Sequence, residues 1–299
     1  MFKKLSVKIT VLVNCILFVV ILVGSSFIVY QQNKSLEEQF AARGKFLSVL
    51  CAKAVSRVME EAIDNGVFTV KDAFDVEYTP VRVPNFDPPK FHTKYDSYTD
   101  KALLPLYDEF LKDKDILYAV ALDVNGYVPT HNTRYQQPIT GDKEKDKVGN
   151  RTKRLFTDPV ARKAATNETD ETLLQIYARD TGEAVWDFST PIYVKGKRWG
   201  STRLGILTDT LDKAKRGLLI NLAGALLVMG ALALLTVYFV VGAALKPLTE
   251  FTGIASRMAD GMVDEKIVPK SNDELGELAD VLERMRISLK TAMDRLTKK

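Results

Sequence analysis

The stretch ITVLVNCILFVVILVGSSFIVY, residues 9–30, decides the architecture together with GLLINLAGALLVMGALALLTVYFVVGAAL, residues 217–245. Neither stretch contains a charged residue. As α-helices they would extend over roughly 33 and 43 Å, and the hydrocarbon core of a bilayer is about 30 Å thick. Both stretches are therefore predicted to span a membrane.

Each stretch has an alternative interpretation. Behind Lys3, Lys4 and Lys8, residues 9–30 could form a cleaved signal peptide. The apolar part of a signal peptide has only about 7 to 15 residues and ends at an A-x-A-like site, which this stretch lacks. Residues 217–245 could form a core helix of a soluble protein, but such a helix rarely stays uncharged for so long. An uncleaved anchor and a second span are favoured.

The charges beside the spans predict the topology. Three lysines before the first span favour a cytoplasmic N-terminus. Lys213, Lys215 and Arg216 oppose this orientation weakly, but long domains are translocated largely regardless of charge. We therefore expect residues 1–8 and everything after residue 245 in the cytoplasm, and residues 31–216 outside it.

The composition limits the partners and the chemistry. The net charge of +4 is spread along the chain rather than gathered in a stripe, so nothing indicates a nucleic-acid partner. Cys15 lies in the first span, so Cys51 has no partner for a disulfide within the domain. With His92 and His131 as the only histidines, no zinc site is expected. Catalytic motifs are also missing, so we predict no enzyme and no catalytic residue.

Between the spans, the pattern predicts an α+β domain. Apolar residues recur at steps of three and four from Leu36 to Ala62, which predicts a long helix that continues the first span and ends near Gly66. Four prolines make residues 65–99 loop-like. Thr99 and Asp100 are predicted to cap a short helix toward residue 112.

Five strands are predicted to follow in an antiparallel sheet. The first two are joined by an Asn125-Gly126 hairpin turn, and residues 141–170 between the second and third are expected to form a helix and loops. A sheet of this kind beside a long helix indicates a PAS-like α+β fold. The predicted strands are residues 117–124, 127–131, 173–179, 184–194 and 198–207.

The region after the second span has the pattern of paired helices. Lys246-Pro247 is predicted to end the span and open a short helix that closes at Gly261. Ser271-Asn272-Asp273-Glu274 matches a capping box, and apolar residues from Leu275 to Leu296 alternate at steps of three and four. Because two such helices cannot bury their apolar seams alone, we predict a parallel homodimer that forms a four-helix bundle.

Residues 243–295 resemble the HAMP domain of bacterial receptors and sensor kinases. The resemblance rests on the expected relay positions: Pro247, Gly261, Asp273, Glu274 and Gly276. Such domains often have Asn where this chain has Glu283. A generic helical hairpin is the alternative, but here the capping and heptad patterns coincide. We place the HAMP domain at residues 246–295 and expect residues 296–299 to begin an output region.

Four runs in the domain between the spans are informative: DVNGYVPTHN from Asp123, NRTKR from Asn150, YARDTGE from Tyr177 and KRWG from Lys197. They are similar to runs that occur in this order in Cache and PAS-like sensory domains of bacterial methyl-accepting chemotaxis receptors. The resemblance covers most of residues 34–207. Some relatives hold a c-type haem through Cys-x-x-Cys-His, which is missing here, so no cofactor is expected.

The resemblance implies a chemotaxis receptor in the bacterial inner membrane. It would bind a small ligand outside the cytoplasm and relay the signal to a cytoplasmic module. Two alternatives stay open. The chain could be the sensory half of a histidine kinase or diguanylate cyclase, because HAMP domains precede those outputs too, or a HAMP-ended accessory receptor.

Strand alternation predicts one face of the ligand site. Tyr177 and Arg179 share a face of their strand, and Asp187 lies on a face of the next. If the two faces coincide, these side chains would bind a small polar ligand, with the guanidinium clamping a carboxylate. The alternative is a structural Arg–Asp pair across the hairpin. We expect Asp187→Ala to remove binding and leave the domain folded.

A second polar cluster contains His131 and Arg134, although a lone histidine is more often a packing residue than a ligand group. Arginines recur in the regions from which a pocket would draw, so the ligand is expected to be anionic. These arginines are Arg134, Arg151, Arg154 and Arg179.

Overall fold

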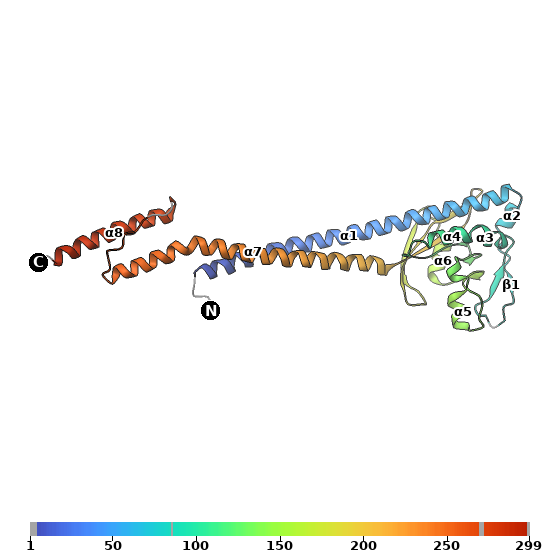
Figure 1. The fold of residues 1–299 in the computed structure, drawn as a ribbon. Helices are drawn as coiled ribbons and strands as arrows, with labels where there is room; N and C mark the ends of the chain where they lie inside the picture. The colour runs from blue at the N-terminus through green and yellow to red at the C-terminus, as the bar shows by residue number, and fades with distance from the viewer. Residues whose placement is uncertain (1–4, 85, 269–271, 298–299) are drawn as a thin grey trace. The chain divides into compact units, whose positions relative to one another are not determined.

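The computed structural model describes residues 5–84, 86–268 and 272–297 (Figure 1). Contacts divide the chain into a central unit, Val29–Leu219, and a second unit formed by Met1–Ile28 and Ile220–Lys299. Lys3, Lys4 and Ser271, which support the predicted topology and capping box, lie outside the described residues.

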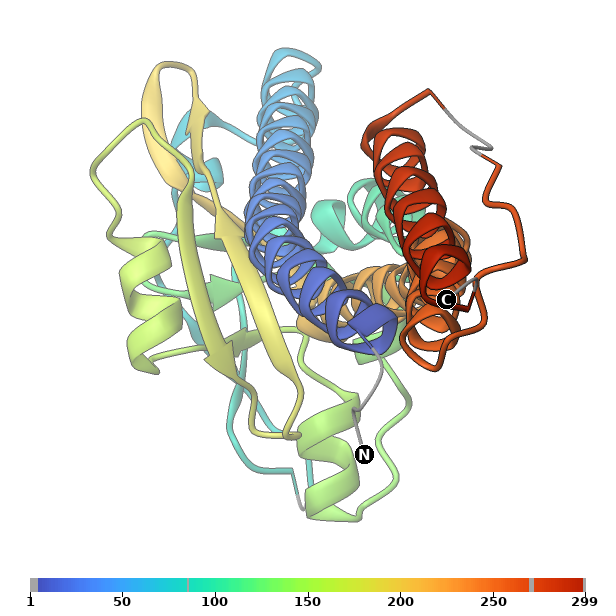
Figure 2. The ribbon, with the colours of Figure 1, turned by 90° about the vertical axis from the view of Figure 1, so that its left-hand side faces the viewer.

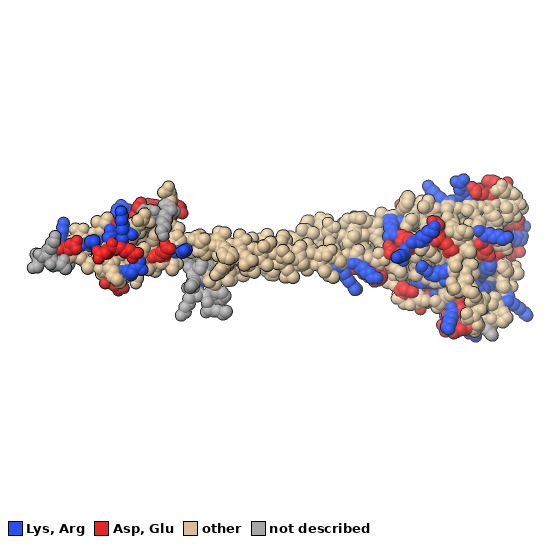
Figure 3. All heavy atoms as spheres, in the orientation of Figure 1, with Lys and Arg blue, Asp and Glu red and all other residues tan. Residues whose placement is uncertain are grey.

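Both predicted spans lie in long helices, α1 (Leu5–Asp64) and α7 (Thr208–Ala259). Each is long and apolar enough to cross a membrane. Only 6% of the most apolar window of α1 is buried and none of that of α7, so neither has the surroundings of a soluble core helix. Figure 3 shows charged side chains of both signs elsewhere on the chain and almost none along these apolar stretches.

The extents of α1 and α7 can be compared with two predictions. The continuation of the first span into a long helix is confirmed, because α1 runs without interruption to Asp64. The predicted break at Lys246-Pro247 is wrong, because Pro247 lies inside α7. Proline removes one amide hydrogen bond, and here the bonded turns on both sides keep the helix continuous.

The central unit contains the predicted five-stranded antiparallel sheet, in the order β3-β9-β7-β6 with β8 also paired to β9. The five strands are not the five predicted ones, because residues 184–194, predicted as one strand, form two. The amide of Thr190, between them, donates to the hydroxyl of Thr202 at 3.3 Å. The strands are β3 (Ile116–Asp123), β6 (Leu173–Ala178), β7 (Ala184–Ser189), β8 (Pro191–Val194) and β9 (Lys197–Leu207).

The predicted return strand 127–131 does not belong to this sheet. The turn itself forms, with the Gly126 amide donating to the Asp123 carbonyl at 3.0 Å. However, the Asp123 carboxylate accepts the Tyr127 amide at 2.9 Å and takes it from the β3 ladder. The strand β4 (Tyr127–Val128) pairs instead with β5 (Arg154–Leu155).

A second, four-stranded sheet has the order β1-β2-β5-β4. Its β1 (Thr79–Val81) and β2 (Lys90–His92), with α2 (Val70–Ala73), lie in the segment predicted to be loop-like. Pro80 is tolerated in β1 because β1 is an edge strand, where a missing amide removes no ladder bond.

Short helices complete the central unit. The helix predicted from Thr99 begins earlier, as α3 (Asp96–Ala102), and α4 (Leu104–Phe110) follows with Pro105 in its first turn. Thr99 is therefore an interior residue of α3 and not a cap. The segment 141–170 contains α5 (Lys143–Gly149) and α6 (Pro159–Ala165), which are capped by the side chains of Asp142 and Asp158.

Helix α1 packs on one face of the five-stranded sheet, as Figure 2 shows beside the yellow strands. Gly44 permits the close approach, since a Cβ there would lie 2.2 Å from the Phe188 ring. The Ser48 hydroxyl donates to the Phe188 carbonyl at 3.0 Å. Because strand side chains alternate, Asp187 points to the other face of the sheet.

The loop before β3 contacts both long helices within the central unit. Arg43 of α1 donates to Asp115 Oδ2 at 3.1 Å and also pairs with Asp113. Thr210 of α7 donates to Asp115 Oδ1 at 2.8 Å, and the Leu207 amide donates to the Asp115 carbonyl at 2.9 Å. A single aspartate thus joins α1, the end of β9 and the start of α7.

Candidate functional site

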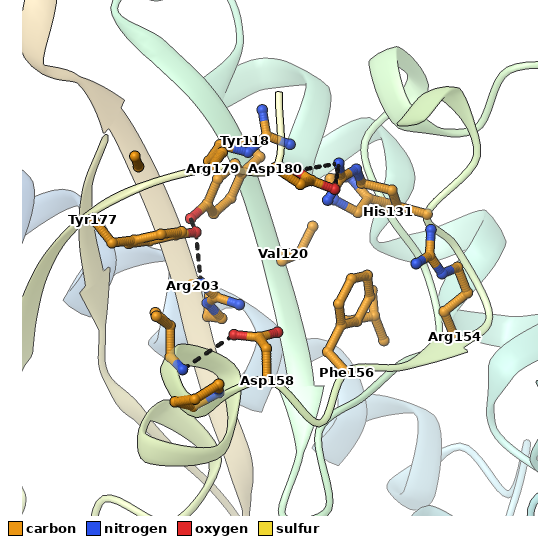
Figure 4. Close-up of a pocket in the computed structure, with 15 residues that line it drawn as sticks. Tyr118, Val120, His131, Arg154, Phe156, Asp158, Tyr177, Arg179, Asp180 and Arg203 are labelled. Carbon is orange, nitrogen blue, oxygen red and sulfur yellow. Dashed lines mark hydrogen bonds and ion pairs between the residues drawn. The ribbon is translucent and has the colours of Figure 1, made fainter. Parts of the chain in front are cut away.

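A cavity of about 400 Å³ lies on the face of the five-stranded sheet that points away from α1. Tyr118 and Val120 of β3 line it, while Ala119 between them packs in the cluster beneath α1. Figure 4 shows the other labelled side chains arranged around Val120. Apart from His131, they come from β3 and β9, from β5 and the residues on either side of it, from the start of α6, and from β6 and the turn that follows it.

Four arginines face this cavity, and each is between 7% and 9% exposed. Two aspartates, Asp158 and Asp180, share the lining, and the Asp158 carboxylate also caps α6. Arginine guanidinium groups bind carboxylates and phosphates through paired hydrogen bonds. The wall is therefore rich in donors for an anion. The arginines are Arg151, Arg154, Arg179 and Arg203.

Arg203 is held by a buried ion pair. Its Nε donates to Asp187 Oδ2 at 2.7 Å, and its Nη2 donates to the Tyr177 hydroxyl at 2.9 Å. The Tyr177 hydroxyl lies 3.0 Å from that of Tyr118. Burial alone would lower the pKa of Arg203, but the Asp187 charge, together with Tyr118 and Tyr177, raises it well above its usual range.

Arg151 and Arg179 each have a partly exposed carboxylate partner. Arg151 Nη2 donates to both carboxylate oxygens of Asp180 at 2.7 Å, and this contact lowers the pKa of Asp180 against the effect of its burial. Arg179 Nη1 donates to the Tyr135 hydroxyl at 2.9 Å and lies 3.8 Å from Glu183 Oε2. Both guanidinium groups are therefore fixed in place at the cavity.

Arg154 differs from the other three arginines because it forms no ion pair within the described ranges. Its Nη1 donates to the Lys147 carbonyl at 2.8 Å, and its Nε has no hydrogen-bond partner among the described residues. The guanidinium lies 5.0 Å from the Phe156 ring centre. Burial, together with the nearby charge of Arg151, lowers its pKa to about 10.

His131 lines the same cavity as a neutral side chain. Burial, and then the charge of Arg151, lowers its pKa well below the usual range. Its Nδ1 accepts the Asn132 amide at 3.0 Å, which requires an unprotonated Nδ1. Its ring packs against that of Tyr135 at 4.9 Å between centres.

The structure brings together four of the six predicted ligand residues: Tyr177, Arg179, His131 and Arg151. The other two lie elsewhere. Arg134 is exposed, and its guanidinium donates to the Ile116 and Leu117 carbonyl groups of β3. Asp187 is fully buried behind Arg203 rather than beside Arg179.

Sequence reasoning missed Arg203 and Tyr118, and for Arg203 a signal was available. It is the only charged residue in the stretch WGSTRLGIL, residues 199–207, which was predicted to be a strand. A charge inside such a strand requires a partner, because a buried unpaired charge is costly. Within the described ranges, no cluster of His, Cys, Asp or Glu is arranged to hold a metal ion.

The predicted relay positions lie in the second unit. Gly261 has φ +82° just after α7, and α8 (Glu274–Thr297) begins where Asp273 accepts the amides of Leu275 and Gly276 at 3.1 and 3.2 Å. Asp273 thus caps α8, and Glu274 is its first residue. Gly276 is buried in the first turn, and Pro247 lies inside α7.

Glu283, the departure from the usual pattern, joins α8 to the connector, the segment between α7 and α8 that contains Val263 and Ile267. Its Oε2 accepts the Ile267 amide at 2.9 Å and Arg286 Nε at 2.8 Å. Arg286 in turn donates to the Val263 carbonyl at 2.6 Å. Contact with Arg286, and then with the Ile267 amide, lowers the pKa of Glu283 to about 2.

Comparison with known families assigns this region, because residues 239–291 match the HAMP domain family. This segment is a HAMP domain. An apolar helix, a folded central unit, a second apolar helix and the HAMP domain follow one another along the chain. This order is that of a transmembrane sensor, in which the HAMP domain relays a signal to a downstream partner.

Similarity to other proteins is low. No curated protein matches the sequence significantly. The ligand-binding domain of the Campylobacter jejuni chemoreceptor Tlp3, in complex with 4-methylisoleucine, has 13% identity and a TM-score of 0.37, over 70% of this chain and 63% of that domain. The chain thus spans less than two thirds of that domain. The E. coli DcuS sensor domain has 18% identity and a TM-score of 0.27, over 37% of this chain and 70% of that one.

Proposed function

We propose that the protein is a receptor of the bacterial inner membrane whose central unit lies outside the cytoplasm and binds a small anion. Binding would be relayed through the two spans to the HAMP domain. The observation that carries this proposal is the group of four buried arginines around one cavity, one of which, Arg154, forms no ion pair within the described ranges.

Electrostatics favours an anionic ligand over a neutral one. A buried cation without a partner is unfavourable, so an anion that approaches Arg154 relieves a cost already present in the empty site. The remaining arginines supply further donors in fixed positions, and a cavity lined mainly by one sign of charge attracts the opposite sign. A carboxylate or phosphate group fits these donors.

The site has short connections to both long helices. Arg203 lies on β9, which leads directly into α7 at Thr208. Its partner Asp187 precedes Phe188, which packs against Gly44 of α1. A ligand that shifts Arg203 therefore acts on strands that contact both helices, and the signal can be no larger than the ligand's differential affinity for the two states.

The test is a thermal-shift screen of the full chain in lipid nanodiscs against organic acids, phosphate esters and amino acids. Trp186 and Trp199, the only tryptophans, both lie in the central unit, so their fluorescence reports the melting of that unit. A ligand at one hundred times its dissociation constant should add about 2.7 kcal/mol of stability. Arg154→Met should abolish the shift, whereas Arg57→Met on the exposed face of α1 should not. Anion-induced shifts that survive Arg154→Met would contradict the proposal.

We also propose that the HAMP domain forms a parallel homodimer. Leu278, Met285 and Leu289 of α8 are 36%, 53% and 43% exposed, which leaves a row of large apolar groups in water. Cysteine at Leu278 or Leu282 should form disulfides between chains under mild oxidation. Leu282 is half-buried against the connector, so we expect faster crosslinking at Leu278. Efficient crosslinking only from Glu277 or Arg284, on other faces, would reject this packing.

Chemotaxis is the output we propose, on the strength of the four sequence runs that resemble chemoreceptor sensors. Deletion of the gene should abolish the swimming response of the host to the ligand found in the screen. A host that keeps this response and instead loses a ligand-dependent change in transcription or cyclic dinucleotide level would have a kinase or cyclase output.

A further inference from the structure

The segment that carries Arg151 and Arg154 is held from behind by a lysine outside the cavity. Lys90 of β2 is 5% exposed, and its ammonium group donates to Asn150 Oδ1 and to the Thr152 carbonyl, both at 2.6 Å. These two residues flank Arg151 on both sides. The backbone of Lys90 is paired with that of Arg154 across the β2–β5 ladder.

This segment depends on external contacts because its backbone is unusual. Lys153 has φ +57°, a left-handed conformation that is unfavourable for residues other than glycine. Its amide donates to the Val128 carbonyl at 2.8 Å, and its carbonyl accepts the Phe91 amide at 2.9 Å. Phe91, which follows Lys90 in β2, and Val128 of β4 thus keep the segment in the conformation that directs Arg151 and Arg154 to the cavity.

The charges around Lys90 are mainly positive. Its ammonium group lies 4.6 Å from the Phe86 ring centre, and no carboxylate within the described ranges forms an ion pair with it. Burial, and then the charges of Arg154 and Lys153, lowers the pKa of Lys90 to about 7, against the opposing effect of Asp100. Asp96 and Asp100 of α3 pair with Lys153, at 3.3 and 2.7 Å. Lys90 therefore changes its charge near neutral pH.

We propose that Lys90 is a positioning residue for the anion site: it orients Arg151 and Arg154 and adds its positive charge to theirs, so ligand affinity falls when Lys90 loses its proton. This inference rests on the proposed function. Lys90 lies outside the cavity, and its protonation makes the ligand affinity of the site depend on pH.

The sign of the effect follows from linkage. A bound anion stabilises the charged form of Lys90, so binding is coupled to proton uptake, and affinity is highest where Lys90 is already charged. Affinity should decrease as pH rises from about 6.5 to about 8.5, by about tenfold for each unit by which the bound anion raises the pKa of Lys90. His131 does not contribute in this range, because its pKa lies well below the usual range.

The experiment measures succinate binding to the full chain in nanodiscs at about pH 6.5, 7.5 and 8.5, from the succinate-dependent shift in tryptophan-detected melting. The parent should lose affinity as pH rises. Lys90→Arg should keep the affinity that the parent has at low pH over the whole range, because arginine stays charged. Lys90→Met should bind about tenfold more weakly than the parent does at about pH 6.5, and its affinity should not change with pH. Lys94→Met, an exposed neighbour paired with Asp72, should behave like the parent.

The outcomes separate this inference from the proposed function. Lys90→Met with the affinity and pH dependence of the parent would overturn the role of Lys90, while loss of binding in Arg154→Met would keep the anion site. Equal loss of affinity in Lys90→Arg and Lys90→Met would show that only packing matters and would also overturn it. If succinate shifts no variant, or Arg154→Met binds like the parent, the proposed site is wrong and the inference fails with it. Melting without succinate shows that each variant is folded.

Discussion

Asp187→Leu is expected to destabilise the central unit strongly. The Asp187 side chain is fully buried and accepts from Arg203 Nε at 2.7 Å. Removing the carboxylate leaves the 8% exposed Arg203 guanidinium without its counter-charge. Breaking a buried pair of this kind costs about 3 to 5 kcal/mol. For a unit of this size, each kcal/mol lowers the melting temperature by about 2 to 4 °C, so the expected decrease is about 6 to 20 °C.

The assay is tryptophan-detected melting of the full chain, with two further variants for comparison. The double variant Asp187→Leu/Arg203→Met replaces both charges by apolar groups of similar size and should recover most of the lost stability. Arg57→Met removes an ion pair whose side chains are 82% and 54% exposed, so its effect on melting should be small.

This prediction revises the expectation from sequence that Asp187→Ala would remove ligand binding and leave the unliganded domain folded. The revision follows from the identity of the partner, because Asp187 neutralises Arg203 inside the fold. Melting of Asp187→Leu within about 2 °C of the parent would refute the reasoning, since it corresponds to less than about 1 kcal/mol. A double variant that melts no higher than Asp187→Leu would refute it too.

Three further predictions concern other parts of the chain. Gly44→Val would place a Cβ 2.2 Å from the Phe188 ring, so it should lower the free energy of unfolding by about 1 to 3 kcal/mol in the same melting assay; unchanged melting would show that α1 does not dock as described. Burial raises the pKa of the Cys51 thiol to about 12, so in a Cys15→Ser background iodoacetamide should label the chain only after urea unfolding, and labelling of the folded protein would contradict this. Arg286 and then the Ile267 amide lower the pKa of Glu283 from 4.5 to about 2, so its contribution to HAMP stability should be complete above about pH 4.5 and lost as pH falls toward 2. Circular dichroism of α8 should follow that loss, and Glu283→Gln should remove the pH dependence between these limits.

Local patterns in the sequence predicted the long helices and the number of strands in the larger sheet. An uncharged run or a heptad is complete within a few turns of chain, so it can be recognised without knowing the neighbours. The partner of residues 127–131 depended on a single side-chain contact, in which the Asp123 carboxylate takes the Tyr127 amide. No periodic pattern contains that information.

The faces on which Tyr177 and Arg179 lie could be predicted from the sequence, but the partner of Asp187 could not. Alternation correctly placed Tyr177 and Arg179 at the cavity, because side-chain direction is a property of one strand. The partner of Asp187 depends on strand order, and β9 lies beside β7 on the side opposite β6. Arg203 of β9 therefore pairs with the carboxylate that was expected beside Arg179, either in a shared ligand site or as an ion pair across the hairpin.

Asp115, just before β3, contacts both α1 and α7 and restricts how these helices can move within the central unit. Arg43 and Thr210 donate to the two oxygens of one carboxylate, Asp115. If one helix slides along the other, at least one of these bonds must lengthen, because both end on the same small group. A rotation of either helix about that group changes neither length at first order. At this level of the unit, the geometry therefore resists axial sliding and leaves Asp115 as a pivot between the two helices.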